Sequence, residues 1–276
     1  MKDIKKYIEP YLTFDEPVPY KDCLNIYEIK VKNWFSFMSA YDILNIEKNK
    51  IPDVQVMQMS YLEFLFQLMI TAETNEIRDK FIIILGLCFG VEYDEKLLNE
   101  EFSPNEILYS PSDGDVVEFS INGYDAKFIS KDNRMFLNIK GVEINSTEFD
   151  DIKRIIMFQN FMDYDDEPMS DDFRNIIQQY YALKNKGVKQ PTLEQKMVAL
   201  MSQLKYTKSE IKDMGYRTFN LILSSILDEQ NYFILKIAQT QGYDKEVEHW
   251  LYKKDKQKYS EAFGDAQAFE NKIKSI

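Results

Sequence analysis

The stretch DYDDEPMSDD, which begins at Asp163, holds the side chains of this sequence that are most suited to chemistry. Five aspartates and one glutamate lie within ten positions. Oxygen ligands at spacing 1, 3 and 5, such as Asp163, Asp165 and Glu167, begin a calcium-binding loop. That loop needs glycine at position 6 and glutamate at position 12, where this sequence has Pro168 and Arg174. The calcium-loop pattern therefore fails at its two most demanding positions.

The same carboxylates have other interpretations. Two of them could act as general acid and base, but no neighbouring residue in the sequence is suited to tune their pKa values. Asp171 has a simpler explanation, since it can cap the helix that follows it. We expect a solvated, helix-capping loop. Recognition of a partner through Asp163, Asp165 and Asp166 is one alternative, and metal binding is the other.

His249, within EVEHWL, is the only histidine of the chain. A single histidine excludes a zinc site built from several histidines and the HExxH motif. A Ser-His-Asp or Cys-His mechanism would have to use His249, and no GxSxG motif supplies the serine. The sequence instead favours a terminal helix that begins near His249 and packs on the protein through Trp250 and Leu251.

Other catalytic motifs are missing as well. Neither GxxxxGK[ST] nor GxGxxG occurs among the nine glycines, and SPSDGD is typical of a turn. Cys23 and Cys88 lie beside apolar residues, which indicates reduced, buried thiols in a cytosolic protein rather than a disulfide or a metal pair. The sequence thus predicts no catalytic residue, no metal site and no cofactor, and a protein that is not an enzyme.

The composition is that of a folded, acidic protein. Of 276 residues 45% are apolar and 14% aromatic, enough for a core in one to two domains. The net charge of −12 disfavours nonspecific binding to nucleic acid or anionic lipid. The longest apolar run, 81–91, is shorter than the ~20 residues of a membrane helix, and the N-terminus lacks a signal-peptide pattern. We expect a soluble cytoplasmic protein without nucleic-acid or membrane partners.

The first part of the chain predicts a strand and then helices. Residues 13–20 contain two prolines and indicate an extended lead-in. Residues 24–32 alternate as a strand does, and 33–46 have helical spacing. Residues 53–72 predict a helix that is apolar around most of its surface, which is typical of a helix buried in a core or bound to a partner. Residues 76–90 fit a buried strand or a helix, and we favour the helix.

Residues 114–146 predict a small antiparallel meander of three to four strands. Asn122-Gly123 is typical of a two-residue hairpin turn. Asn145 and Glu148 then have the spacing of a capping box, which predicts a helix directly after the last strand. A meander of this size needs a helix to pack against.

The last third of the chain predicts helices. One begins after a capping box at Thr192 and Gln195, and the final helical stretch is interrupted at Gly215 and ends at Gly242. The predicted fold class is α+β, mainly helical, with the meander inserted between two helical parts. The predicted divisions are 1–110, 111–145 and 146–276.

Five stretches carry a family resemblance. They are FDEPVPYKDCLNIYEIKVKNWFSF, NKIPDVQVMQMSYLEFL, FQNFMDYDDEPMSDDFR, PTLEQKMVALMSQLKYTKSEIKDMGYRTFNLIL and VEHWL. Their order resembles that in a group of proteins from tailed bacteriophages of Gram-positive hosts, some of which are similar to tail or baseplate-hub assembly chaperones. These motifs are structural rather than catalytic.

The resemblance implies a non-enzymatic phage assembly factor that binds a tail or baseplate structural protein transiently in the host cytoplasm. A structural component of the virion and a phage-encoded binder or inhibitor of a host protein are the alternatives. The methionine- and phenylalanine-rich helix and the stretch YRTFNLIL are candidate contact surfaces, with core packing as the alternative. The predicted partner-binding residues are Met57, Met59, Phe64, Phe66, Met69, Asp163, Asp165, Asp166, Phe219 and Trp250.

Overall fold

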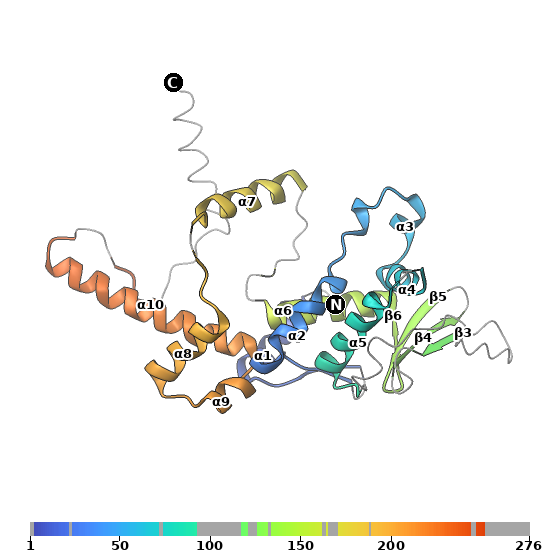
Figure 1. Ribbon diagram of the computed structural model, residues 1–276, viewed down its shortest axis with the longest axis horizontal. Helices are drawn as coiled ribbons and strands as arrows, with labels where there is room; N and C mark the ends of the chain where they lie inside the picture. Colours follow the sequence, from blue (N-terminus) through green and yellow to red (C-terminus); the bar gives the residue numbers. More distant parts are fainter. Residues whose placement is uncertain are drawn as a thin grey trace, which may run out of the picture. The chain divides into compact units, whose positions relative to one another are not determined.

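The computed structural model is of the α+β class and mainly helical, as the sequence predicts (Figure 1). The structure describes residues 3–21, 24–71, 74–92, 117–120, 126–131, 134–161, 164, 171–187, 189–243 and 247–251.

The chain forms two compact units that differ from the predicted divisions. Unit 1 comprises Met1–Asp165 and Ser209–Phe219, and unit 2 comprises Asp166–Lys208 and Asn220–Ile276. The division falls elsewhere because the meander shares one core with the helices that precede and follow it.

Unit 1 begins with a helix that the sequence pattern does not predict, α1 (Ile4–Phe14). The Asp3 side chain caps it by accepting a hydrogen bond from the Lys6 backbone N–H. Strands β1 (Val18–Tyr20) and β2 (Leu24–Ile26) then form an antiparallel pair. The predicted strand 24–32 is therefore too long, because the chain enters a 3-10 turn, η1 (Val31–Asn33).

Short helical elements follow in the order α2 (Trp34–Ala40), η2 (Tyr41–Leu44), η3 (Lys48–Lys50), α3 (Val54–Gln58), α4 (Tyr61–Thr71) and α5 (Glu76–Phe89). The single helix predicted over 53–72 is wrong. The backbone is extended at Met59, where α3 ends, and a new helix, α4, begins at Tyr61. Ser60 and Glu63 exchange reciprocal side-chain to backbone hydrogen bonds, as in a capping box, and this begins α4. The helix favoured over 76–90 is confirmed by α5, which ends at Gly90.

The predicted meander is confirmed as a four-stranded antiparallel sheet in the order β3-β4-β5-β6. Its strands are β3 (Val117–Ser120), β4 (Ala126–Lys131), β5 (Arg134–Ile139) and β6 (Val142–Asn145). The Asn122-Gly123 turn lies outside the described residues. Between β5 and β6, Lys140 and Gly141 have φ values of 52° and 84°, so both adopt the left-handed conformation of a tight hairpin turn.

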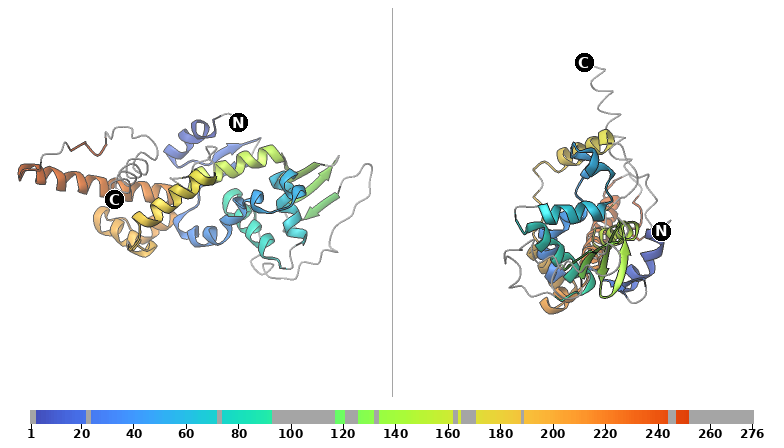
Figure 2. Two further views of the ribbon diagram at one scale, coloured as in Figure 1. Left: turned by 90° about the horizontal axis from the view of Figure 1, so that it is seen from above. Right: turned by 90° about the vertical axis from the view of Figure 1, so that its right-hand side faces the viewer.

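One face of the sheet forms the core of unit 1 together with α4, α5 and α6 (Ser146–Asn160) (Figure 2). The strand register aligns Phe128 with Leu137, and Leu137 with Ile144. The Phe128 ring packs against Phe81 of α5 and Phe66 of α4, with centroid distances of 5.7 and 5.2 Å. The predicted capping box of Asn145 and Glu148 is confirmed, and it begins α6 directly at the end of β6.

Two amides at the end of α6 are buried against the β2 region. Asn160 accepts a hydrogen bond from the Ile29 backbone N–H at 2.9 Å and donates one to the Ile156 carbonyl at 2.8 Å. Gln159 donates to the Ile26 carbonyl at 3.1 Å. These bonds satisfy the backbone carbonyl of Ile26, at the end of β2, and the backbone N–H of Ile29, which lies beyond the strand.

Replacing Asn160 by alanine is expected to lower the free energy of unfolding by about 1–3 kcal/mol, because the buried Ile29 N–H loses its acceptor. Urea unfolding of the full chain measures the change. Asn138→Ala is the matched control, because the Asn138 side chain accepts a more exposed hydrogen bond from the Gly141 N–H. Equal losses in the two variants would contradict a special role for Asn160.

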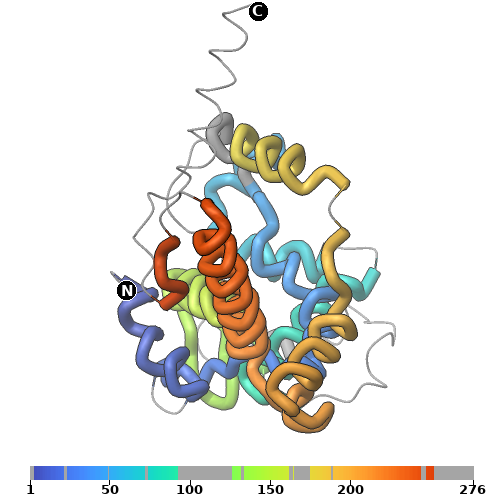
Figure 3. Tube along the Cα trace, turned by 90° about the vertical axis from the view of Figure 1, so that its left-hand side faces the viewer, coloured from blue at the N-terminus to red at the C-terminus, as the bar shows by residue number. Residues whose placement is uncertain are grey.

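Unit 2 contains α7 (Asp171–Lys184), α8 (Leu193–Leu204) and most of α10 (Tyr216–Thr240), which is a single long helix (Figure 3). The predicted capping box at Thr192 and Gln195 is confirmed. So is the predicted break at Gly215, which separates α9 (Lys208–Asp213) from α10. Among the helices that the structure describes, none combines the length and the apolar character needed to span a bilayer.

Candidate functional site

The start of α10 is tied into unit 1 by backbone hydrogen bonds. The Val31 N–H donates to the Met214 carbonyl at 3.0 Å, and the Tyr216 N–H donates to the Ile29 carbonyl at 2.8 Å. These bonds join segments nearly two hundred residues apart, and they hold Gly215 between them. The junction of α9 and α10 is therefore a fixed point of unit 1.

Aromatic packing strengthens this junction. The Trp34 ring stacks on Tyr216 with a centroid distance of 3.4 Å and an interplanar angle of 7°. Trp34 also meets the edge of Phe161. Phe219, one turn after Gly215, is fully buried. The residues Trp34, Gly215, Tyr216 and Phe219 are named the anchor below.

The Glu28 side chain lies next to the anchor, at the start of α10. Its carboxylate accepts a hydrogen bond from the Arg217 backbone N–H at 2.7 Å, in the first turn of α10. A Cβ atom at residue 215 would lie 2.5 Å from the Glu28 Oε1 atom and 2.9 Å from Asp15 Oδ1. Residue 215 must therefore be glycine for Glu28 to reach the helix end, where a negative charge is favourable.

Burial raises the pKa of Glu28 to about 7. The hydrogen bond from the Arg217 backbone N–H opposes this rise, and the negative charge of Asp15 adds to it. Glu28 also lines a pocket of about 200 Å³ together with Asp15, Glu16, Pro17, Tyr27, Lys30 and Gly215. The pocket is smaller than the ~300 Å³ at which ligand sites begin, so the arrangement suits proton uptake and helix capping rather than substrate binding.

A second side chain of unit 1 with a shifted pKa is Lys153 of α6. Lys153 Nζ sits 3.1 Å from the centroid of the Tyr61 ring and 3.4 Å from Asp150 Oδ1. Burial lowers the pKa of Lys153 to about 8, although Asp150 favours the charged form. The Tyr61 hydroxyl donates to the Ile43 carbonyl and accepts from the Ile46 N–H. Tyr61 thus holds the segment between η2 and η3, and Lys153 packs on its ring.

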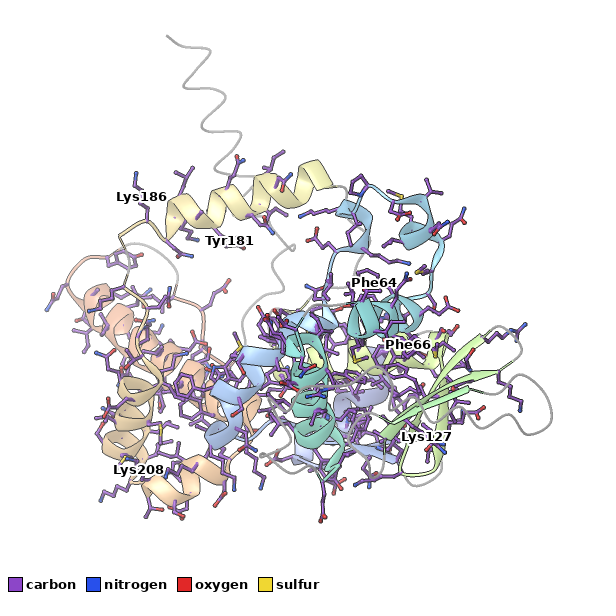
Figure 4. All side chains as sticks on the ribbon, turned by 45° about the vertical axis from the view of Figure 1, so that its right-hand side comes forward. Phe64, Phe66, Lys127, Tyr181, Lys186 and Lys208 are labelled. Carbon is purple, nitrogen blue, oxygen red and sulfur yellow. The ribbon has the colours of Figure 1, made fainter. Side chains whose placement is uncertain are left out.

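The sequence-predicted contact residues of α3 and α4 do not form one surface. Phe64 is 3% exposed, and Phe66 and Met69 pack against the core, so these three side chains serve the interior of unit 1 (Figure 4). Met57 is 45% exposed and Met59 is partly exposed. The break at Met59 and Ser60 separates the two sets.

The remaining predicted residues have diverse positions. Phe219 is buried in the anchor, where packing within unit 1 accounts for it. Trp250 is half-buried beside His249, whose ring also lies 5.0 Å from Tyr232. Residues 250–251 form a turn, and the rest of the terminal helix predicted from His249 lies outside the described residues. Asp163, Asp165 and Asp166 lie outside the described residues, as does Cys23. Cys88 is buried, and this burial raises the pKa of its thiol.

Unit 2 carries exposed apolar side chains that are not among the partner-binding residues predicted from the sequence. Among the described residues of unit 2, only Leu200 is buried, whereas fourteen large apolar side chains are exposed. These fourteen are named the unit 2 apolar set: Ile176, Tyr181, Leu183, Val198, Met201, Leu204, Leu221, Leu227, Phe233, Ile234, Leu235, Ile237, Tyr243 and Leu251. Their helical spacing is visible in the sequence, but the same spacing is typical of a helix packed in a core.

Charge is divided unequally between the units. Unit 1 contains 32 acidic and 19 basic residues, and unit 2 contains 14 and 15. The net charge is therefore −13 in unit 1 and +1 in unit 2. The unit that carries most of the exposed large apolar side chains is thus also the unit that is nearly neutral, a combination that favours association.

Fold and surface together define an α+β protein with one acidic, well-packed unit and one nearly neutral helical unit whose apolar side chains are exposed. No protein-family model, curated protein or solved structure matches this chain. The phage resemblance of the five sequence stretches accordingly stays a prediction.

Proposed function

We propose that the protein is a non-enzymatic bacteriophage assembly factor, which binds a tail or baseplate structural protein transiently in the host cytoplasm. The observation that carries this proposal is the unit 2 apolar set, fourteen exposed side chains against one buried residue among those described. Large apolar patches on a protein surface commonly mark sites that another molecule covers.

The partner surface that we propose consists of the apolar residues on α7 and α8. On α7, Leu183 is 70% and Ile176 58% exposed, and Figure 4 shows Tyr181 on the same helix. On α8, Val198 is 56% and Leu204 47% exposed. An amphipathic helix or an apolar strand of the partner can pack on such helices, as in helix-in-groove recognition.

The charge division supports a chaperone in particular. Unit 1, with its net charge of −13, keeps a complex in solution through charge repulsion. Unit 2 carries almost no net charge, so long-range charge repulsion does not oppose its approach to a partner of either sign. A partner segment that would otherwise aggregate is then shielded until it is placed in the particle.

Quantitative mass spectrometry of infected-cell lysate and of purified particles tests this role. An assembly factor is expected to be abundant in the lysate and absent from particles. A fixed copy number per particle would contradict the chaperone and indicate a structural component. A protein that is absent from particles and bound to a host protein would indicate the inhibitor alternative.

Surface variants link the role to α7 and α8. The double variant Leu183→Ser, Val198→Ser is expected to lose the co-purifying structural protein and to reduce particle yield. Phe35→Ser is the matched control, because Phe35 of unit 1 is 71% exposed and lies outside the proposed surface. Equal yields for the two variants would contradict a role for α7 and α8.

A further inference from the structure

The long helix α10 carries an apolar stripe along one side. At 3.6 residues per turn, residues at alternating spacings of three and four lie on the same side of a helix. This stripe, named the α10 stripe, consists of Leu223, Ile226, Leu227, Gln230, Phe233, Ile234 and Ile237. The charged residues Asp228, Glu229 and Lys236 lie outside it. The spacing is that of a helix which pairs with another helix.

The α10 stripe has the same pattern in both directions from Gln230. Apolar residues occur three, four and seven positions before Gln230 and at the same distances after it. The pairs are Leu227 and Phe233, Ile226 and Ile234, and Leu223 and Ile237. This symmetry is what a two-fold axis that crosses the helix at Gln230 requires, because each residue then meets the residue at the same distance on the other side of Gln230 in the partner helix.

Much of the stripe has no cover among the described residues. Leu227 is 59%, Phe233 55%, Ile234 63% and Ile237 60% exposed. Gln230 is exposed at the centre of the stripe. A partner that covers these side chains must also provide a hydrogen-bond donor and acceptor for the Gln230 amide, which would otherwise be buried without partners.

We propose that a second copy of this chain covers the α10 stripe and forms an antiparallel helix pair with its two-fold axis at Gln230. In that pair Leu227 packs on Phe233 of the partner helix, and Ile226 packs on Ile234. The two Gln230 side chains meet at the axis, where each amide N–H donates to the carbonyl oxygen of the other. The only polar side chain of the stripe thus finds its hydrogen-bond partner in the same residue of the second copy.

Charge selects the antiparallel arrangement. Each unit 1 carries a net charge of −13, and α10 begins in unit 1 at Tyr216. In a pair centred on Gln230, the two Phe219 residues are 22 positions apart along the helix direction, about 33 Å at 1.5 Å per residue. That separation exceeds the Debye length of about 8 Å at physiological salt. A parallel pair would place the two acidic ends side by side.

The dimer goes beyond the proposed function and does not depend on it. Self-association through α10 leaves the apolar residues of α7 and α8 available, so each dimer presents two partner surfaces. Because self-association is measured on the purified protein alone, failure of the dimer and failure of the assembly role give separate results.

Sedimentation velocity over a concentration series tests the dimer. The wild-type chain is expected to sediment as a dimer at micromolar concentration, and Phe233→Lys with Ile237→Lys as a monomer. If each of two symmetric contacts loses about 1.4 kcal/mol of binding free energy, the dissociation constant already rises about 100-fold. Leu221→Lys is the matched control, since Leu221 is 41% exposed on the opposite side of the same helix, and it is expected to remain dimeric. Circular dichroism verifies that each variant stays folded.

Cysteine cross-linking tests the direction of the pair. Gln230→Cys is expected to form an intermolecular disulfide with itself, whereas Leu223→Cys forms one only when it is mixed with Ile237→Cys. The wild-type chain controls for Cys23 and Cys88. Self-linking of Leu223→Cys as fast as that of Gln230→Cys would indicate a parallel pair and overturn the proposal. A monomer at every concentration overturns it as well, and leaves residues 252–276 or another protein as the cover.

Discussion

Replacing Phe219 by alanine is expected to lower the free energy of unfolding of unit 1 by about 3–5 kcal/mol, the range observed when a buried phenylalanine is truncated. Phe219 is fully buried and lies one turn after Gly215, beside Tyr216 with a ring-centroid distance of 6.1 Å. Its removal leaves a cavity under the first turn of α10. Chemical unfolding monitored by the fluorescence of Trp34, which stacks on Tyr216, measures the loss where it occurs.

The control for Phe219 is a phenylalanine that the solvent already reaches. Phe35 is 71% exposed, so Phe35→Ala is expected to change stability by less than about 0.5 kcal/mol. If both variants lose the same stability, the anchor does not hold α10 to unit 1. The comparison also tests whether Phe219 serves packing or partner binding, because the free energy of unfolding is measured on the isolated chain, where no partner is present.

Replacing Glu28 by glutamine is expected to stabilise the protein at pH 8 and to have little effect at pH 4. Burial raises the pKa of Glu28 to about 7, above the 4.5 of an exposed glutamate. The folded chain therefore holds a proton between these values that the unfolded chain releases, so this residue costs stability as the pH rises through that window. A shift of this size corresponds to about 3 kcal/mol, at 1.36 kcal/mol per pKa unit.

The difference between wild type and Glu28→Gln isolates this one group from the rest of the titration. Glutamine resembles the protonated acid and can still accept the hydrogen bond from the Arg217 N–H. The charged groups that face residue 28 are Asp15 of the α1 cap, Glu16, Lys30 and Arg217. Urea unfolding at unit pH steps from 4 to 8 should show the two curves separating above pH 4.5. Parallel curves, or a less stable variant at pH 8, would contradict the buried charge.

Elements set by short-range chemistry were predictable from the sequence. The capping boxes at Asn145 and Thr192 bond to residues three positions away, so their helices begin where the sequence indicates. The meander was predicted from short strands separated by turn residues, and the break at Gly215 from a single glycine. The cap formed by Ser60 and Glu63 has the same chemistry, but the apolar run around it concealed the break between α3 and α4.

Features that depend on contacts far apart in the chain were not predictable. The Glu28 carboxylate bonds to Arg217, 189 positions away, and no local pattern indicates that pairing. The same holds for the hydrogen bonds that join Ile29 and Val31 to the start of α10 and so assign Phe219 to the core. The unit 2 apolar set was overlooked because helical spacing of apolar residues does not distinguish a buried face from an exposed one.

The most direct test of the proposed partner surface is site-specific photo-cross-linking in infected cells. A photoreactive amino acid is placed at Leu183 or Val198 of the unit 2 apolar set, and at Phe35 of unit 1 as the control. Mass spectrometry then identifies the cross-linked protein. A tail or baseplate structural protein captured from Leu183 and Val198, but not from Phe35, is the predicted result. Capture of a host protein alone, or equal capture from all three positions, would contradict it.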